Sequence, residues 1–92
     1  MDTLTFEVER KLPRPARLQA VVRVAQGDRY VGDILIDLRG RVWRHADTIP
    51  GDVVLKAHLA RRRGEGFGQI VGLRDGRVYS WVVVGTTAEP AA

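Results

Sequence analysis

The chain has 92 residues, no cysteine and a formal net charge of +4, with 45% hydrophobic and 28% charged residues. A chain of this length forms one domain with a shallow core, and without cysteine it builds neither disulfides nor zinc–thiolate sites nor a cysteine nucleophile. Small secreted domains usually depend on disulfides, so this composition favours the cytoplasm. No basic segment followed by an apolar stretch opens the sequence, and no apolar run reaches the ~20 residues of a membrane span, so we expect neither a signal peptide nor a membrane helix.

Arginine dominates the basic residues. Of the 15 lysine and arginine residues, only Lys11 and Lys56 are lysine. A basic surface of this kind suits nucleic acid or an acidic protein surface as a partner. GC-rich coding produces the same excess of arginine, so composition leaves both explanations open.

Hydrophobic alternation predicts six strands. In the first, residues 3–9, three apolar residues share one face while threonine and glutamate occupy the other. Glycine-rich turns separate the later segments, and Arg74-Asp75-Gly76 is a strong hairpin signal. The last segment has large apolar residues on both faces, which is typical of a central strand. The predicted strands are residues 3–9, 18–25, 30–38, 41–44, 67–73 and 77–84.

Residues 52–63 are the ambiguous segment. Asp52 suits a helix N-cap, the arginines at 61–63 suit the negative end of a helix dipole, and Gly64 suits a helix end. Alternation over residues 53–60 also fits a strand. We expect a helix, because its start and stop signals agree.

The short connections between the predicted strands imply an antiparallel sheet, and hence a mainly β, α+β fold with one short helix. We expect the sheet to curl into a small, partly open barrel. An open antiparallel sheet with the helix on one face is the alternative. The predicted domain spans residues 1–85, and the small residues of 86–92 indicate a flexible C-terminal tail.

Three motifs follow one another in the middle of the chain. They read Tyr-Val-Gly-Asp-Ile-Leu-Ile-Asp-Leu-Arg-Gly at 30–40, Ile-Pro-Gly-Asp-Val at 49–53 and Gly-Gln-Ile-Val at 68–71. This order resembles the OB-fold RNA-binding domains of translation initiation factor one and of the TRAM type. The resemblance implies an OB-like barrel that binds RNA. The chain departs from the family pattern by an added N-terminal strand and by a basic run where the initiation factor continues as a strand.

Arginine and aromatic residues supply a candidate nucleic-acid site. Phosphates need several cations on one face, and arginine can hold a phosphate with two hydrogen bonds. Trp43 lies among arginines, where an exposed ring could stack on a base, although aromatic residues more often belong to a core. Tyr79 and Trp81 share a predicted strand face and could form a second aromatic patch. The predicted binding residues are Arg41, Trp43, Arg44, Arg61, Arg62 and Arg63.

No catalytic or metal site is predicted. His45, Asp47 and His58 are too few and too scattered for a zinc site. Asp33 and Asp37 share a strand face about 13 Å apart, too far for paired acid–base chemistry, and we expect them to face arginines across the sheet.

The sequence therefore predicts a non-catalytic binding domain without cofactor or metal. Its expected partner is RNA or single-stranded DNA, bound through an arginine-rich face. The alternative is a protein-interaction module or a homodimer that uses a strand at residues 79–84 or 3–9 as a pairing edge.

Overall fold

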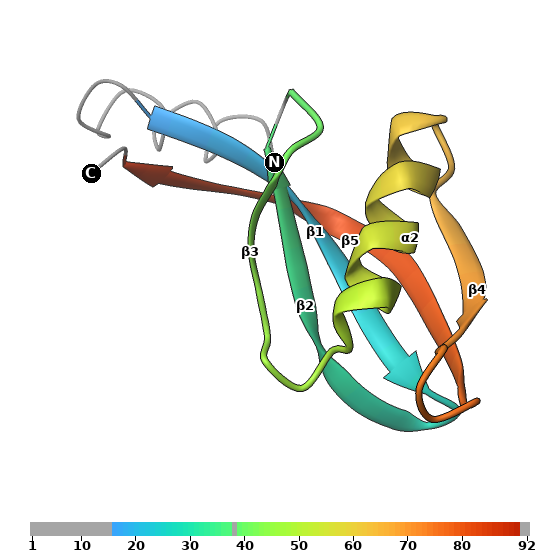
Figure 1. Cartoon of the computed structure of the whole chain (residues 1–92). Helices are drawn as coiled ribbons and strands as arrows, with labels where there is room; N and C mark the ends of the chain where they lie inside the picture. Colours follow the sequence, from blue (N-terminus) through green and yellow to red (C-terminus); the bar gives the residue numbers. More distant parts are fainter. Residues whose placement is uncertain (1–15, 38, 91–92) are drawn as a thin grey trace.

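A computed structural model of the chain describes residues 16–37 and 39–90 (Figure 1). The predicted strand at residues 3–9 lies outside these ranges. Within them, five strands and one helix follow in the order β-β-β-α-β-β. They are β1 (Ala16–Gln26), β2 (Arg29–Asp37), β3 (Val42–His45), α2 (Gly51–Arg62), β4 (Phe67–Val71) and β5 (Val78–Pro90).

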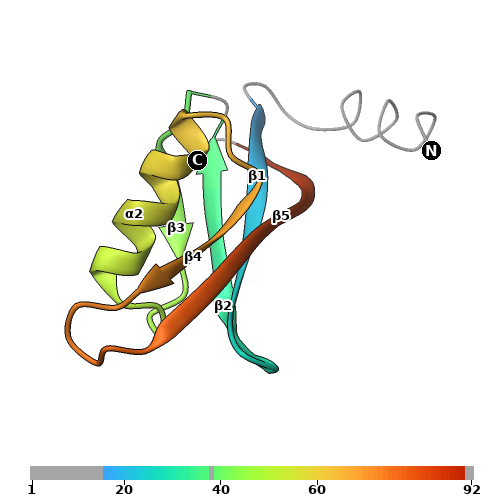
Figure 2. The same cartoon turned by 90° about the vertical axis from the view of Figure 1, so that its right-hand side faces the viewer.

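The five strands form one antiparallel sheet in the order β3-β2-β1-β5-β4. The sheet curls, and α2 lies across its concave face, flanked by the edge strands β3 and β4 (Figures 1 and 2). The sheet is not closed into the barrel that we expected, because the helix fills the space in which the two edges would have to meet. The alternative, an open antiparallel sheet with the helix on one face, is confirmed.

β5 is the longest strand and lies between β1 and β4. Its central position was predicted, but its length was not. Residues 86–90, expected to be a flexible tail, pair with residues 16–20 of β1. Small side chains do not prevent this pairing, because the ladder uses backbone groups that every residue but proline provides in full. The pairing edge considered at residues 79–84 is also wrong, since β5 lies between β1, which pairs with residues 80–83, and β4, which pairs with residues 78–82.

The start of α2 differs from the prediction. Pro50 occupies the N-cap position, and no side chain of residues 16–37 or 39–90 caps the first turn. The Pro50 carbonyl accepts hydrogen bonds from the N–H groups of Val53 and Val54 at 3.0 and 3.1 Å. Asp52 lies inside the first turn, where its carboxylate accepts a 2.8 Å hydrogen bond from the Leu73 N–H. Asp52 therefore ties the helix start to the loop between β4 and β5.

The end of α2 is a Schellman motif. Gly64 donates to the Arg61 carbonyl at 2.9 Å, and Glu65 donates to the Ala60 carbonyl at 3.1 Å. Gly64 has a φ of +90°, a conformation that other residues adopt only at a cost. The predicted helix and its stop signal are confirmed, and the strand interpretation of residues 53–60 is wrong.

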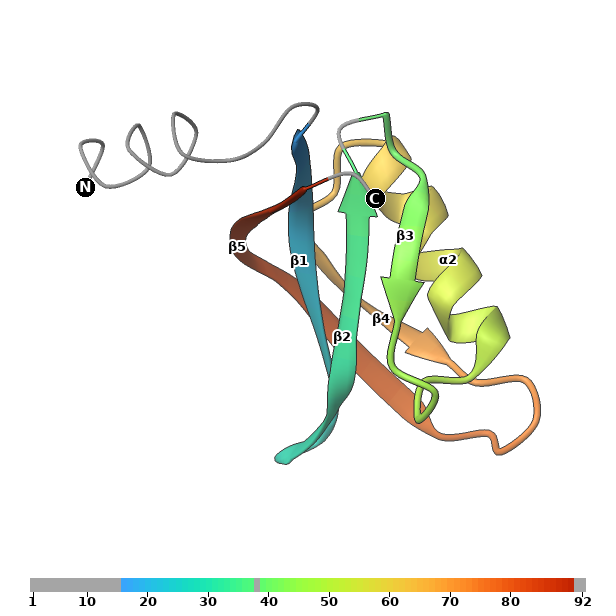
Figure 3. The ribbon, with the colours of Figure 1, turned by 90° about the vertical axis from the view of Figure 1, so that its left-hand side faces the viewer.

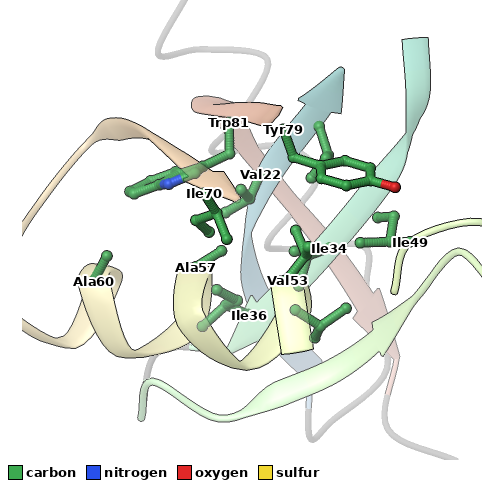
Figure 4. Close-up of a cluster of buried hydrophobic side chains, with 12 residues drawn as sticks. Val22, Ile34, Ile36, Ile49, Val53, Ala57, Ala60, Ile70, Tyr79 and Trp81 are labelled. Atoms are coloured by element: carbon green, nitrogen blue, oxygen red, sulfur yellow. The ribbon is translucent and has the colours of Figure 1, made fainter. Parts of the chain in front are cut away.

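The core lies between α2 and the concave face of the sheet (Figure 4). Tyr79 and Trp81 are only 4% and 3% exposed, so they belong to this core and form no surface patch. Gln19 is also fully buried, and neither polar atom of its amide has a hydrogen-bond partner among the residues that the structure describes. The buried hydrophobic residues are Val22, Val24, Ile34, Ile36, Ile49, Val53, Val54, Ala57, Ala60, Ile70, Tyr79 and Trp81.

The role of Asp52 can be tested by its removal. Asp52→Ala leaves the Leu73 N–H without its acceptor and removes a favourable charge from the helix start. We expect the free energy of unfolding to fall by about 1–2 kcal/mol in urea denaturation. Asp47→Ala, in the preceding loop, is the control and should change stability by less than about 0.5 kcal/mol. Equal effects of the two substitutions would contradict a stabilising role for the hydrogen bond between Leu73 and Asp52.

A second test concerns the β4–β5 turn. The Tyr79 hydroxyl donates a 2.5 Å hydrogen bond to Asp75, and this bond, with another from the Arg77 N–H, holds the pKa of the Asp75 carboxyl below its usual value. A lowered carboxyl pKa adds stability above the ordinary pKa of about 3.9, and this stability is lost as pH falls through the lowered value. In Tyr79→Phe, the pKa of Asp75 should rise in an NMR titration, and stability should depend less on pH in acid. Tyr30→Phe should change neither.

Candidate functional site

The turn between β2 and β3 presents two arginines. The Asp37 carboxylate accepts 3.0 Å hydrogen bonds from the backbone N–H groups of Arg39 and Arg41. Two backbone hydrogen bonds of 2.9 Å close the turn. The Gly40 N–H donates to the Asp37 carbonyl, and the Asp37 N–H donates to the Arg41 carbonyl. Because Asp37 bonds to the backbone of the two arginines, their side chains are left exposed on the turn.

The end of α2 meets this turn. A Cβ placed on Gly40 would lie 3.5 Å from Cγ of Arg62, so the arginine stem packs beside the glycine. Figure 3 shows the start of β3 and the end of α2 at the same end of the molecule. The fold thus brings together two arginine clusters, around Arg41 and Arg62, that are about twenty residues apart in the sequence. Arg39 was not among the predicted binding residues, although its position directly before Gly40 in the predicted turn could have indicated it.

Trp43 and Arg44 follow Arg41 along β3, and Arg44, directly opposite Leu35, lies on the convex face of the sheet, away from α2. Leu35 pairs with Arg44 and Ile36 with Val42, so Trp43 is the extra residue of a β-bulge. Its side chain is 37% exposed, which makes it neither a core residue nor a fully open ring. Both Trp43 and Arg44 also interact with other residues of the chain.

The three arginines at the end of α2 have different roles. The Arg61 guanidinium donates a 2.6 Å hydrogen bond to the Glu65 carbonyl, and Arg63 forms a 3.0 Å ion pair with the Glu65 carboxylate. Arg62 is exposed and forms no ion pair with any other described residue. We give the name arginine patch to Arg39, Arg41, Trp43, Arg44 and Arg62, which lie at the β2–β3 turn, on β3 and at the end of α2.

A second feature is the free edge of β4. At its two ends, the Gly66 carbonyl accepts from the Val83 N–H and the Gly72 N–H donates to the Arg77 carbonyl, both at 2.9 Å. Backbone groups alternate in direction along a strand, so the even-numbered residues bond to β5. The N–H and C=O groups of Phe67, Gln69 and Val71 therefore point away from β5, and no other described strand pairs with them.

A groove of about 410 Å³ lies between this strand and α2. Lys56, Leu59 and Arg63 line it on the helix side, and residues 68–71 and Trp81 line it on the sheet side. Since Arg63 is paired with Glu65, Lys56 is the one groove cation without an ion pair among the described residues. The groove leaves room for the side chains of a strand added beside β4.

The two acidic residues of β2 have different partners. Arg23 lies directly opposite Asp33, with Nε 3.4 Å from Oδ1, which confirms the cross-strand pairing expected for Asp33. The residue opposite Asp37 is Gln19 and not the arginine that we expected. In residues 16–37 and 39–90, no three histidine, aspartate or glutamate side chains gather as metal ligands. The same ranges contain no helix with the length and apolar character needed to span a membrane.

Comparison with protein-family models, with curated proteins and with solved structures gave no match for this chain.

The different roles of neighbouring arginines predict different stabilities. Arg61→Gln removes a hydrogen bond that holds the residues after α2, and should lower the free energy of unfolding by about 0.5–1.5 kcal/mol. Arg62→Gln leaves the described contacts of the fold in place and should stay within about 0.5 kcal/mol. Thermal or urea denaturation of the two variants measures this difference. An equal loss in both would mean that Arg62 is also structural.

Proposed function

We propose that this chain is a non-catalytic domain that binds RNA or single-stranded DNA through the arginine patch. The observation that carries the proposal is the position of the Arg62 stem beside Gly40, which brings the end of α2 next to the turn that carries Arg39 and Arg41. Among the described residues, Arg39, Arg41 and Arg62 have no anionic partner, so their guanidinium groups are available to phosphates.

The neighbouring ring suits a single-stranded partner. Trp43 is partly exposed on the same strand as Arg44, and base stacking on a ring beside cations is how single strands are bound without sequence reading. The likeness to OB-fold RNA-binding domains and the cytoplasmic location belong to this proposal. Arg61 and Arg63 would act mainly by positioning the end of α2, since their side chains bond to Glu65.

Salt dependence tests the phosphate contacts. Arg39, Arg41, Arg44 and Arg62 provide about four contacts, so binding of a mixed-sequence oligonucleotide should weaken with salt with a log–log slope near −3. Replacing Arg41 and Arg62 together by Gln removes two contacts, and the slope should become shallower by about 1.4. Fluorescence anisotropy with labelled RNA and DNA measures both quantities.

A charge-matched variant provides the control. Arg29 and Arg77 line a hollow near the β1–β2 turn, and replacing both by Gln changes the net charge by the same amount. This control should retain the wild-type slope. Equal weakening in both double variants would mean that binding depends only on the total charge and not on the arginine patch. Absence of binding at low salt would contradict the proposal as a whole.

Trp43 gives an independent spectroscopic test. Trp81 is 3% exposed, so a change in tryptophan fluorescence on binding must come mainly from Trp43. If the ring stacks on a base, Trp43→Ala should cost about 1–3 kcal/mol of affinity. Trp43→Phe, which keeps a ring, should retain most of the affinity and lose the fluorescence change. A change that persists in Trp43→Phe would contradict stacking on this ring.

A second candidate function is that of a protein-interaction module, and the free β4 edge favours it. Natural sheets protect such edges with charged residues or proline, and the strand Phe67–Val71 contains neither. Adding a strand from a partner would satisfy the outward backbone groups of Phe67, Gln69 and Val71.

A further inference from the structure

We infer that the β4 edge pairs with β4 of a second copy of this chain, antiparallel and centred on Gln69. This inference rests on the second candidate function, strand addition at β4, and is independent of nucleic-acid binding. The outward backbone groups belong to Phe67, Gln69 and Val71, which are placed symmetrically about Gln69. In antiparallel pairing, each of these residues would therefore both donate to and accept from an outward residue of the second copy.

The side chains match in this register. On the convex face of the sheet, Phe67 would lie opposite Val71 of the second copy, and the reverse, while the two Gln69 amides would lie side by side. Aromatic and β-branched residues in direct opposition are a favourable cross-strand pair. On the concave face, Gly68 would lie opposite Ile70 of the second copy, so the residue without a side chain meets the large one.

Other registers lose this match. A shift by two residues sets Gln69 opposite Phe67 or Val71 and shortens the paired segment. The register centred on Gln69 uses the whole of β4 and creates a two-fold axis, which closes the assembly at two copies.

Apolar residues exposed on the convex face support the pairing. Phe67 is 76% exposed and Val71 is 56% exposed. On β5, the partly exposed Val82 lies opposite Phe67, and the partly exposed Val78 lies opposite Val71. In a single copy this stripe faces water. In the pair, the stripes of the two copies would join across the axis, and the Phe67 and Val71 side chains would cover each other.

Charge argues for a second copy over an acidic peptide. The strand Phe67–Val71 carries no charge, and the Arg63 charge in the adjoining groove is balanced by Glu65. Lys56 alone would remain in the groove to meet an acidic segment. The uncharged, self-complementary strand thus fits its own copy better than a partner recognised by charge.

Substitution at the two-fold axis gives the test. In Gln69→Lys, two lysines would meet at the axis, and in Gln69→Glu two glutamates would meet, so each variant alone should sediment as a monomer of 10.2 kDa. An equimolar mixture should regain the dimer, because each pair then sets lysine against glutamate. The wild type should sediment at twice the monomer mass. Thr86→Lys and Thr86→Glu, exposed on β5 beyond the paired region, are the matched controls and should stay dimeric.

A covalent trap checks the same register without charge. The chain has no cysteine, so Gln69→Cys introduces the only thiol. Directly opposed residues of a hydrogen-bonded antiparallel pair have Cα atoms ~5.5 Å apart, within the ~4.4–6.8 Å range of disulfides. Mild oxidation should yield a disulfide-linked dimer from Gln69→Cys and none from Thr86→Cys.

The outcomes separate this inference from the function on which it rests. A wild type that stays monomeric at its highest soluble concentration overturns the second-copy inference, and so does a mixture of Gln69→Lys and Gln69→Glu that fails to regain the dimer. A lysine-flanked peptide copying residues 66–72 then tests strand addition alone. Protection of the Phe67, Gln69 and Val71 amides from hydrogen exchange by this peptide would keep the interaction-module function. No protection in a monomeric chain would overturn both.

Discussion

The packing of α2 between two edge strands is the constraint on which the other features depend. The helix turns small residues, Val53, Ala57 and Ala60, toward the sheet, so its axis can approach closely. The sheet supplies the bulk, above all the indole of Trp81. That ring needs Gly68 on the neighbouring strand, because a Cβ there would lie 2.9 Å from the indole nitrogen. One helix therefore completes the core over the concave face of a five-stranded sheet that is not closed into a barrel.

The same packing determines what remains exposed. The end of α2 is closed by its Schellman motif, and Arg62 in the last turn of the helix lies beside Gly40 of the β2–β3 turn. The helix covers only the concave face, so the convex face of β4 and β5 keeps exposed Phe67 and Val82. A single helix on one face of the sheet thus leaves both candidate surfaces uncovered.

Local patterns in the sequence predicted the elements, but they left the choice between a barrel and an open sheet undecided and did not give the order of the strands. Alternation located β1, β2 and β5, and Gly64 located the end of the helix, because these signals act between residues close in the chain. The order of the strands depends on contacts between distant segments, and no local pattern encodes it. Residues 86–90 illustrate this, since only their pairing with β1 makes them a strand. Likewise, the bond from Leu73 to Asp52 spans 21 residues, so it was not visible in a capping motif.

The candidate site was predictable in part for the same reason. Arginine clusters are visible in the sequence, and the prediction that Arg41 and Arg62 serve one surface needed only that β3 and the helix end be neighbours. The sequence could not show that Arg61 and Arg63 bond to Glu65 while Arg62 stays exposed. These bonds depend on the path of the chain after Gly64, which brings Glu65 back to the helix.

The two candidate surfaces do not compete for the same residues. The arginine patch includes residues of β3 and of the helix end, and the free edge belongs to β4, at the opposite edge of the sheet from β3. A two-fold axis at Gln69, perpendicular to the sheet, keeps both helices on one face, so the two helix ends with Arg62 would lie on the same side of the pair. A single strand of nucleic acid long enough to reach both patches would bind the second one at a high effective concentration. Pairing at an uncharged edge would thus strengthen binding by a patch that has only a few cations in each copy.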